Sequence, residues 1–178
     1  DVPGHVSAMI AAYPKLATVR ELSKPSTQFG PHDGALNPMK EETYEFLEKL
    51  FTEMSTLFPD DYFHVGGDEV SGKHWMNDPE IQQYMKEKKI KDVVELQFQF
   101  TKRIEMIVSK IHKRMLAWDE VLKEGGDLKA TVQIWRGPKY ANMALLRHSP
   151  IIMSYGYYLD LQLSSETHYK TDPSQDLI

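Results

Sequence analysis

Two adjacent carboxylates, Asp68 and Glu69, follow a short apolar stretch and two glycines in the segment His64-Val-Gly-Gly-Asp-Glu. Placing two like charges this close is unfavourable unless the pair is used, and a carboxyl group that keeps its proton at neutral pH can act as a general acid. The segment therefore predicts acid catalysis. A glycine turn followed by two solvated acids is the plain alternative for the same residues.

Other residues that suit catalysis or ligand binding stand near the expected ends of apolar strands. In a parallel sheet the carboxyl ends of the strands meet at one edge, and in a β/α barrel that edge carries the active site. We therefore expect the side chains at these ends to gather at one site. They are Asp1, His5, Trp118, Trp135, Tyr158 and Asp160.

The elements that must position these residues are read from the spacing of apolar side chains. Helical spacing runs to Phe58 after Asn37-Pro38, where we expect Asn37 to cap the helix and Pro38 to be its first residue. Helices are also expected from Asp78-Pro79, from Asp92 to Ile111 and over 138–148. Short apolar runs predict strands over 62–65, 115–118, 131–135 and 151–155, and the Pro- and Gly-rich stretch 23–34 predicts a long loop. Strands that alternate with helices imply parallel pairing and an α/β fold.

Composition narrows the class of protein. The 178 residues carry a formal charge of −5 and no basic stripe, which argues against nucleic acid as a partner. Cysteine is absent, so disulfides and thiolate chemistry are excluded. No apolar run approaches the roughly 20 residues of a membrane span. Because the first residue is Asp and the chain opens within a motif, we interpret the sequence as a piece of a longer protein.

Five motifs, taken in order along the chain, carry a resemblance to a known family. Singly each is a weak signal, but together they cover nearly the whole sequence at plausible separations. The set resembles the family 20 glycoside hydrolases, which are exo-acting β-N-acetylhexosaminidases. The motifs are Asp1-Val-Pro-Gly-His5, His64-Val-Gly-Gly-Asp-Glu69, Trp118-Asp-Glu120, Val132-Gln-Ile-Trp135 and Tyr157-Tyr-Leu-Asp160.

The resemblance implies a catalytic role for four residues. Glu69 would be the general acid and base, and Asp68 would orient and polarise the 2-acetamido group of the substrate. His5 would support Glu69 by hydrogen bonding, and Tyr158 would hold the acetamido oxygen. The family is retaining and substrate-assisted, so the acetamido group itself is the nucleophile.

The remaining site residues would bind the sugar. The resemblance implies that Trp118 and Trp135 wall the pocket around the acetyl methyl, and that Asp160 binds a sugar hydroxyl. Aromatic walls suit this task because the C–H face of a sugar and an acetyl methyl are apolar. The implied substrates are glycans or chitooligosaccharides that end in N-acetylglucosamine or N-acetylgalactosamine. We expect no cofactor and no metal ion.

Plainer interpretations stay open for these residues. His5 could be a turn residue after Pro-Gly, Asp160 could serve its own loop, and Trp118 and Trp135 could be core side chains. Glu120 is more simply a salt-bridge partner than a sugar ligand, and we leave it out of the site. A metal site would have to draw on His64, Asp68, Glu69 and His74, which show no recognised ligand spacing.

The expected fold is a partial (β/α)8 TIM barrel covering roughly the third to seventh units, since a complete barrel needs about 250 residues. Residues 1–178 would form one incomplete family 20 catalytic domain. Its open edges predict self-association or association with the missing barrel portion, and its isolated activity is in doubt. A non-catalytic carbohydrate-binding or assembly remnant is the rival function, and a metal-dependent hydrolase on an unrelated barrel is a third. The sequence leaves localisation unknown, although the family resemblance implies a secreted, periplasmic or lysosomal protein.

Overall fold

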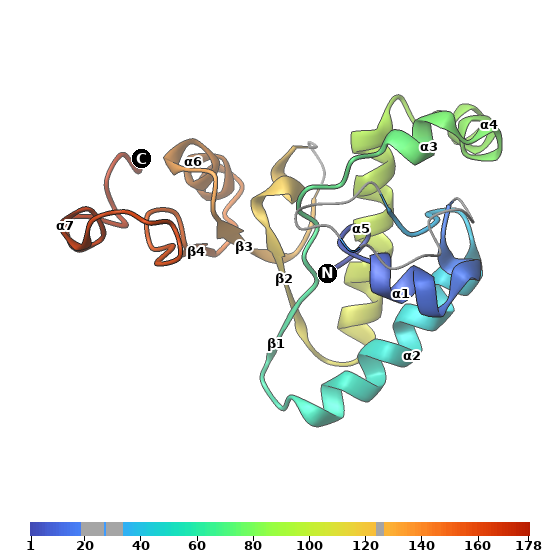
Figure 1. Cartoon of the computed structure of the whole chain (residues 1–178), viewed down its shortest axis with the longest axis horizontal. Helices are drawn as coiled ribbons and strands as arrows, with labels where there is room; N and C mark the ends of the chain where they lie inside the picture. The colour runs from blue at the N-terminus through green and yellow to red at the C-terminus, as the bar shows by residue number, and fades with distance from the viewer. Residues whose placement is uncertain (19–26, 28–33, 124–126) are drawn as a thin grey trace.

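The computed structural model describes residues 1–18, 27, 34–123 and 127–178, so most of the predicted loop over 23–34 lies outside the described residues. Its centre is one parallel sheet whose strands follow each other in chain order, with α-helices or a 3₁₀ turn between successive strands (Figure 1). This arrangement confirms the predicted parallel pairing. The strands are β1 (Tyr62–His64), β2 (Arg114–Trp118), β3 (Ala130–Ile134) and β4 (Ile151–Met153).

The longer helices lie close to their predicted positions. They are α2 (Glu41–Leu57), α4 (Pro79–Lys88), α5 (Val93–Lys110) and α6 (Pro138–Leu146). Asp78 caps α4 by accepting the N–H groups of Glu80 and Ile81, and Asp92 caps α5 by accepting that of Glu95.

The start of α2 differs from the prediction. Asn37-Pro38 does not cap the helix, because α2 begins at Glu41 after an extended Lys40. The Asn37 side chain accepts the N–H of Met39 at 2.9 Å instead, which closes a local turn before the helix.

Several short elements gave no clear periodic signal. They are α1 (Ser7–Ala12), the 3₁₀ turn η1 (Pro14–Leu16), α3 (Lys73–Asn77), the 3₁₀ turn η3 (Asp119–Leu122) and α7 (Ser165–Tyr169). Each is shorter than two helical turns, so a 3.6-residue period has too few positions to be recognised. Within the described part of the chain, no helix combines the length and apolarity that crossing a bilayer requires.

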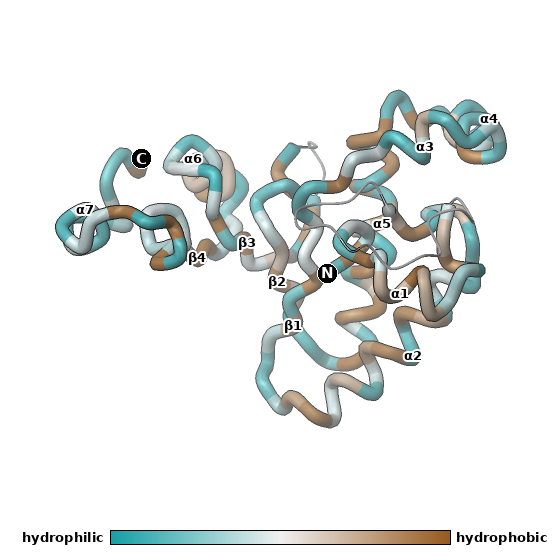
Figure 2. Tube along the Cα trace, in the orientation of Figure 1, coloured by the Kyte–Doolittle hydropathy of each residue, from teal (hydrophilic) through white to brown (hydrophobic). Residues whose placement is uncertain are grey.

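The main core lies between the sheet and the helices α2 and α5. Figure 2 shows hydrophobic and hydrophilic residues interleaved along both helices, as expected for helices with one buried face. The apolar spacing of α5 predicts a buried stripe that also includes Val93 and Ile111, but these two residues are only half-buried. The buried members are Leu96, Phe100, Ile104, Ile107 and Val108. A smaller cluster joins α6 to β3 and β4.

The N-terminal segment lies against the end of β1. The N–H of Val2 donates to the carbonyl of Val65 at 2.8 Å, and the Asp1 carboxylate accepts the N–H of Gly67 at 3.0 Å. The segment therefore lies beside β1 on the side away from β2, where the preceding barrel strand would end. The described sheet and this segment agree with a partial barrel.

The approach of Asp1 leaves no room for a side chain at Gly66. A Cβ there would lie 1.9 Å from Asp1 Oδ1, and the backbone has a φ of +82°. Gly67 is a matched control, because its φ is also positive, at +97°, but nothing lies within 4 Å of its Cβ position.

We predict that Gly66→Ala lowers the free energy of unfolding by about 3 kcal/mol or more, because backbone strain and a steric clash combine. Gly67→Ala should cost about 1 kcal/mol from strain alone. Urea denaturation of both variants measures the difference. Equal losses would contradict the close packing of Asp1 on β1.

Candidate active site

The loop after β1, residues 65–69, carries the two predicted carboxylates, and we call it the carboxylate loop. Its backbone conformation is unusual. Glu69 has a φ of +50°, and His5, across from it on the N-terminal segment, has a φ of +51°. Few residues other than glycine adopt this left-handed conformation, and such strain concentrates at functional sites. The sequence gives no sign of either conformation.

The structure brings His5, Asp68 and Glu69 together. The Nε2 atom of His5 lies 3.3 Å from Asp68 Oδ2 and 3.4 Å from Glu69 Oε2. One imidazole nitrogen thus faces both carboxylates and can share a proton with either. The positive partial charge of its N–H reduces the repulsion between the two acids.

Asp68 keeps one oxygen available. Its Oδ1 atom is buried and accepts no hydrogen bond from any residue that the structure describes. A buried acceptor without a donor is unfavourable by itself, so this oxygen is suited to accept an N–H or O–H from a ligand.

His64 connects the β1 loop to Trp118 at the end of β2. The His64 and Trp118 rings lie 5.0 Å apart with an edge-to-face tilt of 62°. The Nδ1 atom of His64 accepts the N–H of Gly66 at 3.0 Å. Burial lowers the pKa of His64, and a hydrogen bond with the Gln133 side chain opposes that shift. Trp118 is therefore packed beside the carboxylate loop.

The other predicted residues line one cavity at the same edge of the sheet. Trp135, Tyr158 and Asp160 border a cavity of about 860 Å³ between the end of β3 and the segment that leads to α7. Burial raises the pKa of the Tyr158 hydroxyl; a hydrogen bond with Ser154 opposes this shift, while the negative charge of Asp68 adds to it. His5, Asp68, Glu69 and Trp118 do not themselves line this cavity.

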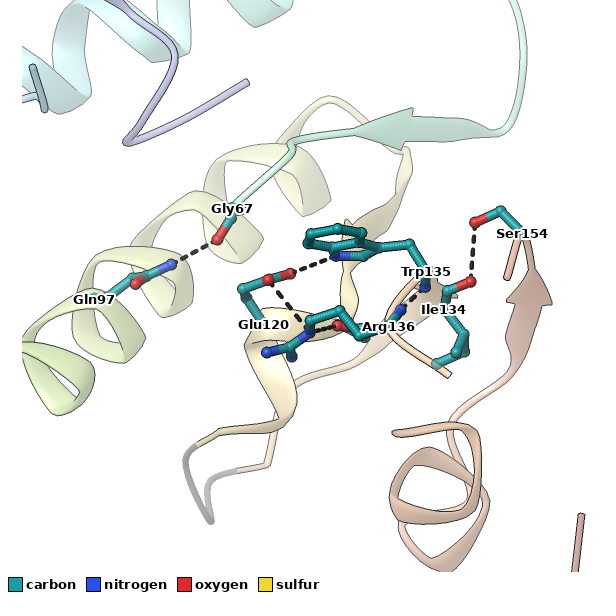
Figure 3. A network of polar contacts seen from close by, with 8 residues as sticks. Gly67, Gln97, Glu120, Ile134, Trp135, Arg136 and Ser154 are labelled. Carbon is teal, nitrogen blue, oxygen red and sulfur yellow. Dashed lines mark hydrogen bonds and ion pairs between the residues drawn. The ribbon is translucent and has the colours of Figure 1, made fainter. Parts of the chain in front are cut away.

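Trp135 is held by the two acids that follow Trp118 (Figure 3). Its indole Nε1–H donates to Glu120 at 3.1 Å, and its main-chain N–H donates to Asp119 at 3.0 Å. Arg136 forms ion pairs with both acids. The expectation that Glu120 is a salt-bridge partner holds, but its bond to Trp135 was not expected.

Helix α5 holds the carboxylate loop through a hydrogen bond from one of its side chains. The Gln97 side chain donates to the carbonyl of Gly67 at 2.7 Å (Figure 3). Sequence reasoning missed Gln97, since a lone glutamine on a helix carries no signal. It also missed Asp119 and Arg136, although the Trp-Asp-Glu string marks the first of them.

The residues that could hold a metal ion in the structure share only Asp68 with those weighed in the sequence. Asp1, His5 and Asp68 each place one donor atom within 4.8 Å of the others. Asp1 Oδ1 accepts the N–H of Gly67, and His5 Nε2 lies 3.3 Å from Asp68 Oδ2, whereas Asp68 Oδ1 has no partner among the described residues. His74 lies apart from them on α3.

The comparisons with known proteins decide the family. The family model described as glycosyl hydrolase family 20, catalytic domain, matches residues 1–176. The chain belongs to glycosyl hydrolase family 20. It is 36% identical over 177 residues to a β-hexosaminidase of Porphyromonas gingivalis, which covers 98% of this chain and 22% of that protein. It is 34% identical over 183 residues to the β-hexosaminidase subunit beta of Felis catus, covering 97% of this chain and 34% of that one.

Solved family 20 structures share the fold. A chitobiase from Flavobacterium johnsoniae has a TM-score of 0.90 and 35% identity, covering 97% of this chain and 27% of that chain. A family 20 exo-β-N-acetylglucosaminidase from Vibrio harveyi, solved with N-acetylglucosamine, has a TM-score of 0.81 and 26% identity, covering all of this chain and 31% of that one. The predicted partial TIM-barrel fold is confirmed, and the chain spans about a third or less of the length of these relatives.

The lowered pKa of His64 predicts a pH dependence of stability. Between the ordinary pKa of about 6.5 and the lower folded-state value, the unfolded chain binds more protons than the folded one. Stability therefore falls as the pH drops through this window. We predict that the stability advantage of the wild type over His64→Gln is larger at about pH 8 than at about pH 5. Urea denaturation across this range measures it, and a constant difference would contradict a lowered pKa of His64 in the folded protein.

Proposed function

We propose that the whole protein to which this chain belongs removes terminal, non-reducing β-linked N-acetylhexosamine from glycans or chitooligosaccharides with retention of configuration. The arrangement of His5, Asp68 and Glu69 is the observation that carries the proposal. The β-hexosaminidases among its relatives support it. Residues 1–178 would be one incomplete catalytic barrel domain.

The geometry of the carboxylates favours a substrate-assisted reaction. An enzyme that supplies its own nucleophile needs two carboxyl groups facing each other across the sugar, about 5–5.5 Å apart. Asp68 and Glu69 instead contact the same imidazole nitrogen, so they lie on one side of any bound sugar. This arrangement favours an attacking group that comes from the substrate, and a 2-acetamido carbonyl could supply it intramolecularly.

Each residue near the carboxylates then has a distinct role. Glu69 protonates the leaving oxygen and later removes a proton from the attacking water. The free Oδ1 atom of Asp68 accepts the acetamido N–H as positive charge develops on the closing ring. Tyr158 donates to the acetamido oxygen, and His5 keeps both carboxylates in place.

The aromatic residues enclose the sugar. Trp135 lies in the wall of the cavity and would contact the acetyl methyl, with Trp118 on the side of the carboxylate loop. Asp160, also at the cavity, would accept a hydrogen bond from a sugar hydroxyl. Excluding water from such a pocket strengthens the hydrogen bonds made inside it.

We predict that Glu69→Gln in the whole protein lowers kcat for an aryl N-acetylglucosaminide by about 10² or more, because the amide cannot donate the required proton. Glu53→Gln is the matched control, since Glu53 is exposed on α2. It should hydrolyse at the wild-type rate. Near-normal turnover by Glu69→Gln would refute the assignment. Binding of N-acetylglucosamine by calorimetry, without hydrolysis by the wild type, would favour a carbohydrate-binding remnant instead.

The proposal extends to association of the chain with itself or with the rest of a barrel. Beyond β4 the surface carries exposed leucines, with Leu159 at 80%, Leu161 at 54% and Leu163 at 50% exposure. In the described sheet no strand pairs with the outer side of β4. Open strands and exposed apolar side chains favour association.

We predict that the chain sediments as a concentration-dependent mixture of species larger than a monomer. Replacing Leu159 and Leu161 by Glu should shift the mixture towards monomer, because it places charge on the apolar surface. Leu57→Glu, at an equally exposed leucine on the end of α2, should not. A folded, monodisperse monomer at every concentration would contradict the association.

A further inference from the structure

The buried acid Glu120 has no part in the chemistry proposed above, yet it contacts a residue that lines the pocket. Its Oε2 atom accepts the indole Nε1–H of Trp135 at 3.1 Å (Figure 3). Glu120 is only 6% exposed, whereas Trp135 borders the cavity. The hydrogen bond thus joins a buried carboxylate to one wall of the candidate sugar site.

The neighbouring Asp119 holds the main chain of the same tryptophan. Its Oδ2 atom accepts the N–H groups of Trp135 at 3.0 Å and of Arg136 at 3.1 Å. These bonds fix the backbone after β3, and the bond to Glu120 fixes the far end of the indole. The two acids at the end of β2 therefore set both the position and the orientation of Trp135.

Arg136 compensates much of the charge that these acids bury. Its Nε atom forms an ion pair with Asp119 and lies 3.4 Å from Glu120 Oε1. Its guanidinium also lies over the Tyr140 ring, 3.9 Å from the centroid. One cation cannot neutralise two carboxylates, so the N–H donors of Trp135 and Arg136 are needed to satisfy the remaining oxygens. Arg136 Nη2 is buried without a partner among the described residues, so losing a further bond of this network would leave a second buried polar atom unpaired.

We propose that Glu120 is a positioning residue that fixes the Trp135 indole and thereby limits the size of the 2-acylamido group that the pocket accepts. The proposal rests on the proposed function, in which Trp135 encloses the acetyl methyl of the substrate. A fixed indole leaves space for that methyl and excludes a longer acyl chain. A mobile indole would admit an N-propionyl sugar more readily.

Two conservative variants separate this role from simple charge pairing. Glu120→Gln keeps an acceptor oxygen at the same distance along the side chain but removes the charge. Glu120→Asp keeps the charge for Arg136 but withdraws the oxygen from Trp135 by one methylene. If Glu120 positions the indole, Glu120→Gln keeps the Trp135 contact and Glu120→Asp loses it. If Glu120 is only a counter-ion to Arg136, Glu120→Asp is the milder change and Glu120→Gln the more disruptive one.

The first readout is hydrogen exchange of the indole N–H groups, measured by NMR on the chain as it stands. Trp75 is the internal control, because its Nε1–H donates to the Leu36 carbonyl at 3.1 Å in a separate buried cluster. We expect the Trp135 N–H to exchange about tenfold faster in Glu120→Asp, with little change in Glu120→Gln and none at Trp75. An unchanged Trp135 in Glu120→Asp, the reverse order of the variants, or faster exchange at both tryptophans in both variants would overturn the proposal.

The second readout is the ratio of kcat/KM for aryl N-acetyl- and N-propionylglucosaminides in the whole protein. Glu120→Asp should lower this preference by about tenfold, and Glu120→Gln should leave it near the wild-type value. An unchanged preference in Glu120→Asp would overturn the role in acyl specificity. If the wild type hydrolyses neither substrate, the proposed function is refuted. The hydrogen-exchange measurement still tests whether Glu120 fixes the Trp135 indole.

Discussion

The His5 imidazole, placed between the carboxylates of Asp68 and Glu69, is the contact on which the rest of the site depends. Two adjacent acids repel each other, and a shared N–H donor allows them to stay close at one strand end. This arrangement requires backbone strain, since both His5 and Glu69 adopt positive φ values. The surrounding hydrogen bonds must hold that strained arrangement in place.

Those hydrogen bonds come from three directions. The Asp1 carboxylate binds the Gly67 N–H, Gln97 of α5 binds the Gly67 carbonyl, and His64 binds the Gly66 N–H. The loop is therefore fixed by the preceding barrel unit, by the helix beneath it and by its own strand. A second network, from Asp119 and Glu120 to Trp135, fixes the opposite wall in a similar way. The barrel contributes rigidity at the point where several strand ends meet.

The sequence predicted the parallel strands and the long helices well, because apolar spacing and caps such as Asp78 and Asp92 are local signals. It also predicted which residues lie at strand ends. It could not predict that His5 contacts both acids, because that contact joins segments more than sixty positions apart and depends on two left-handed residues. The contacts of Gln97 with Gly67 and of Glu120 with Trp135 were missed for the same reason. The sequence shows a helix glutamine or a buried acid without showing which residue it contacts.

The central claim is that the acetamido group of the substrate, rather than a carboxylate facing Glu69, performs the attack. Turnover of aryl glucosaminides whose N-acetyl group carries successively more fluorine tests this most directly, because fluorine withdraws electrons from the carbonyl oxygen. If that oxygen is the nucleophile, kcat of the whole protein falls steeply with each fluorine added. A rate that does not respond to fluorination would contradict the account.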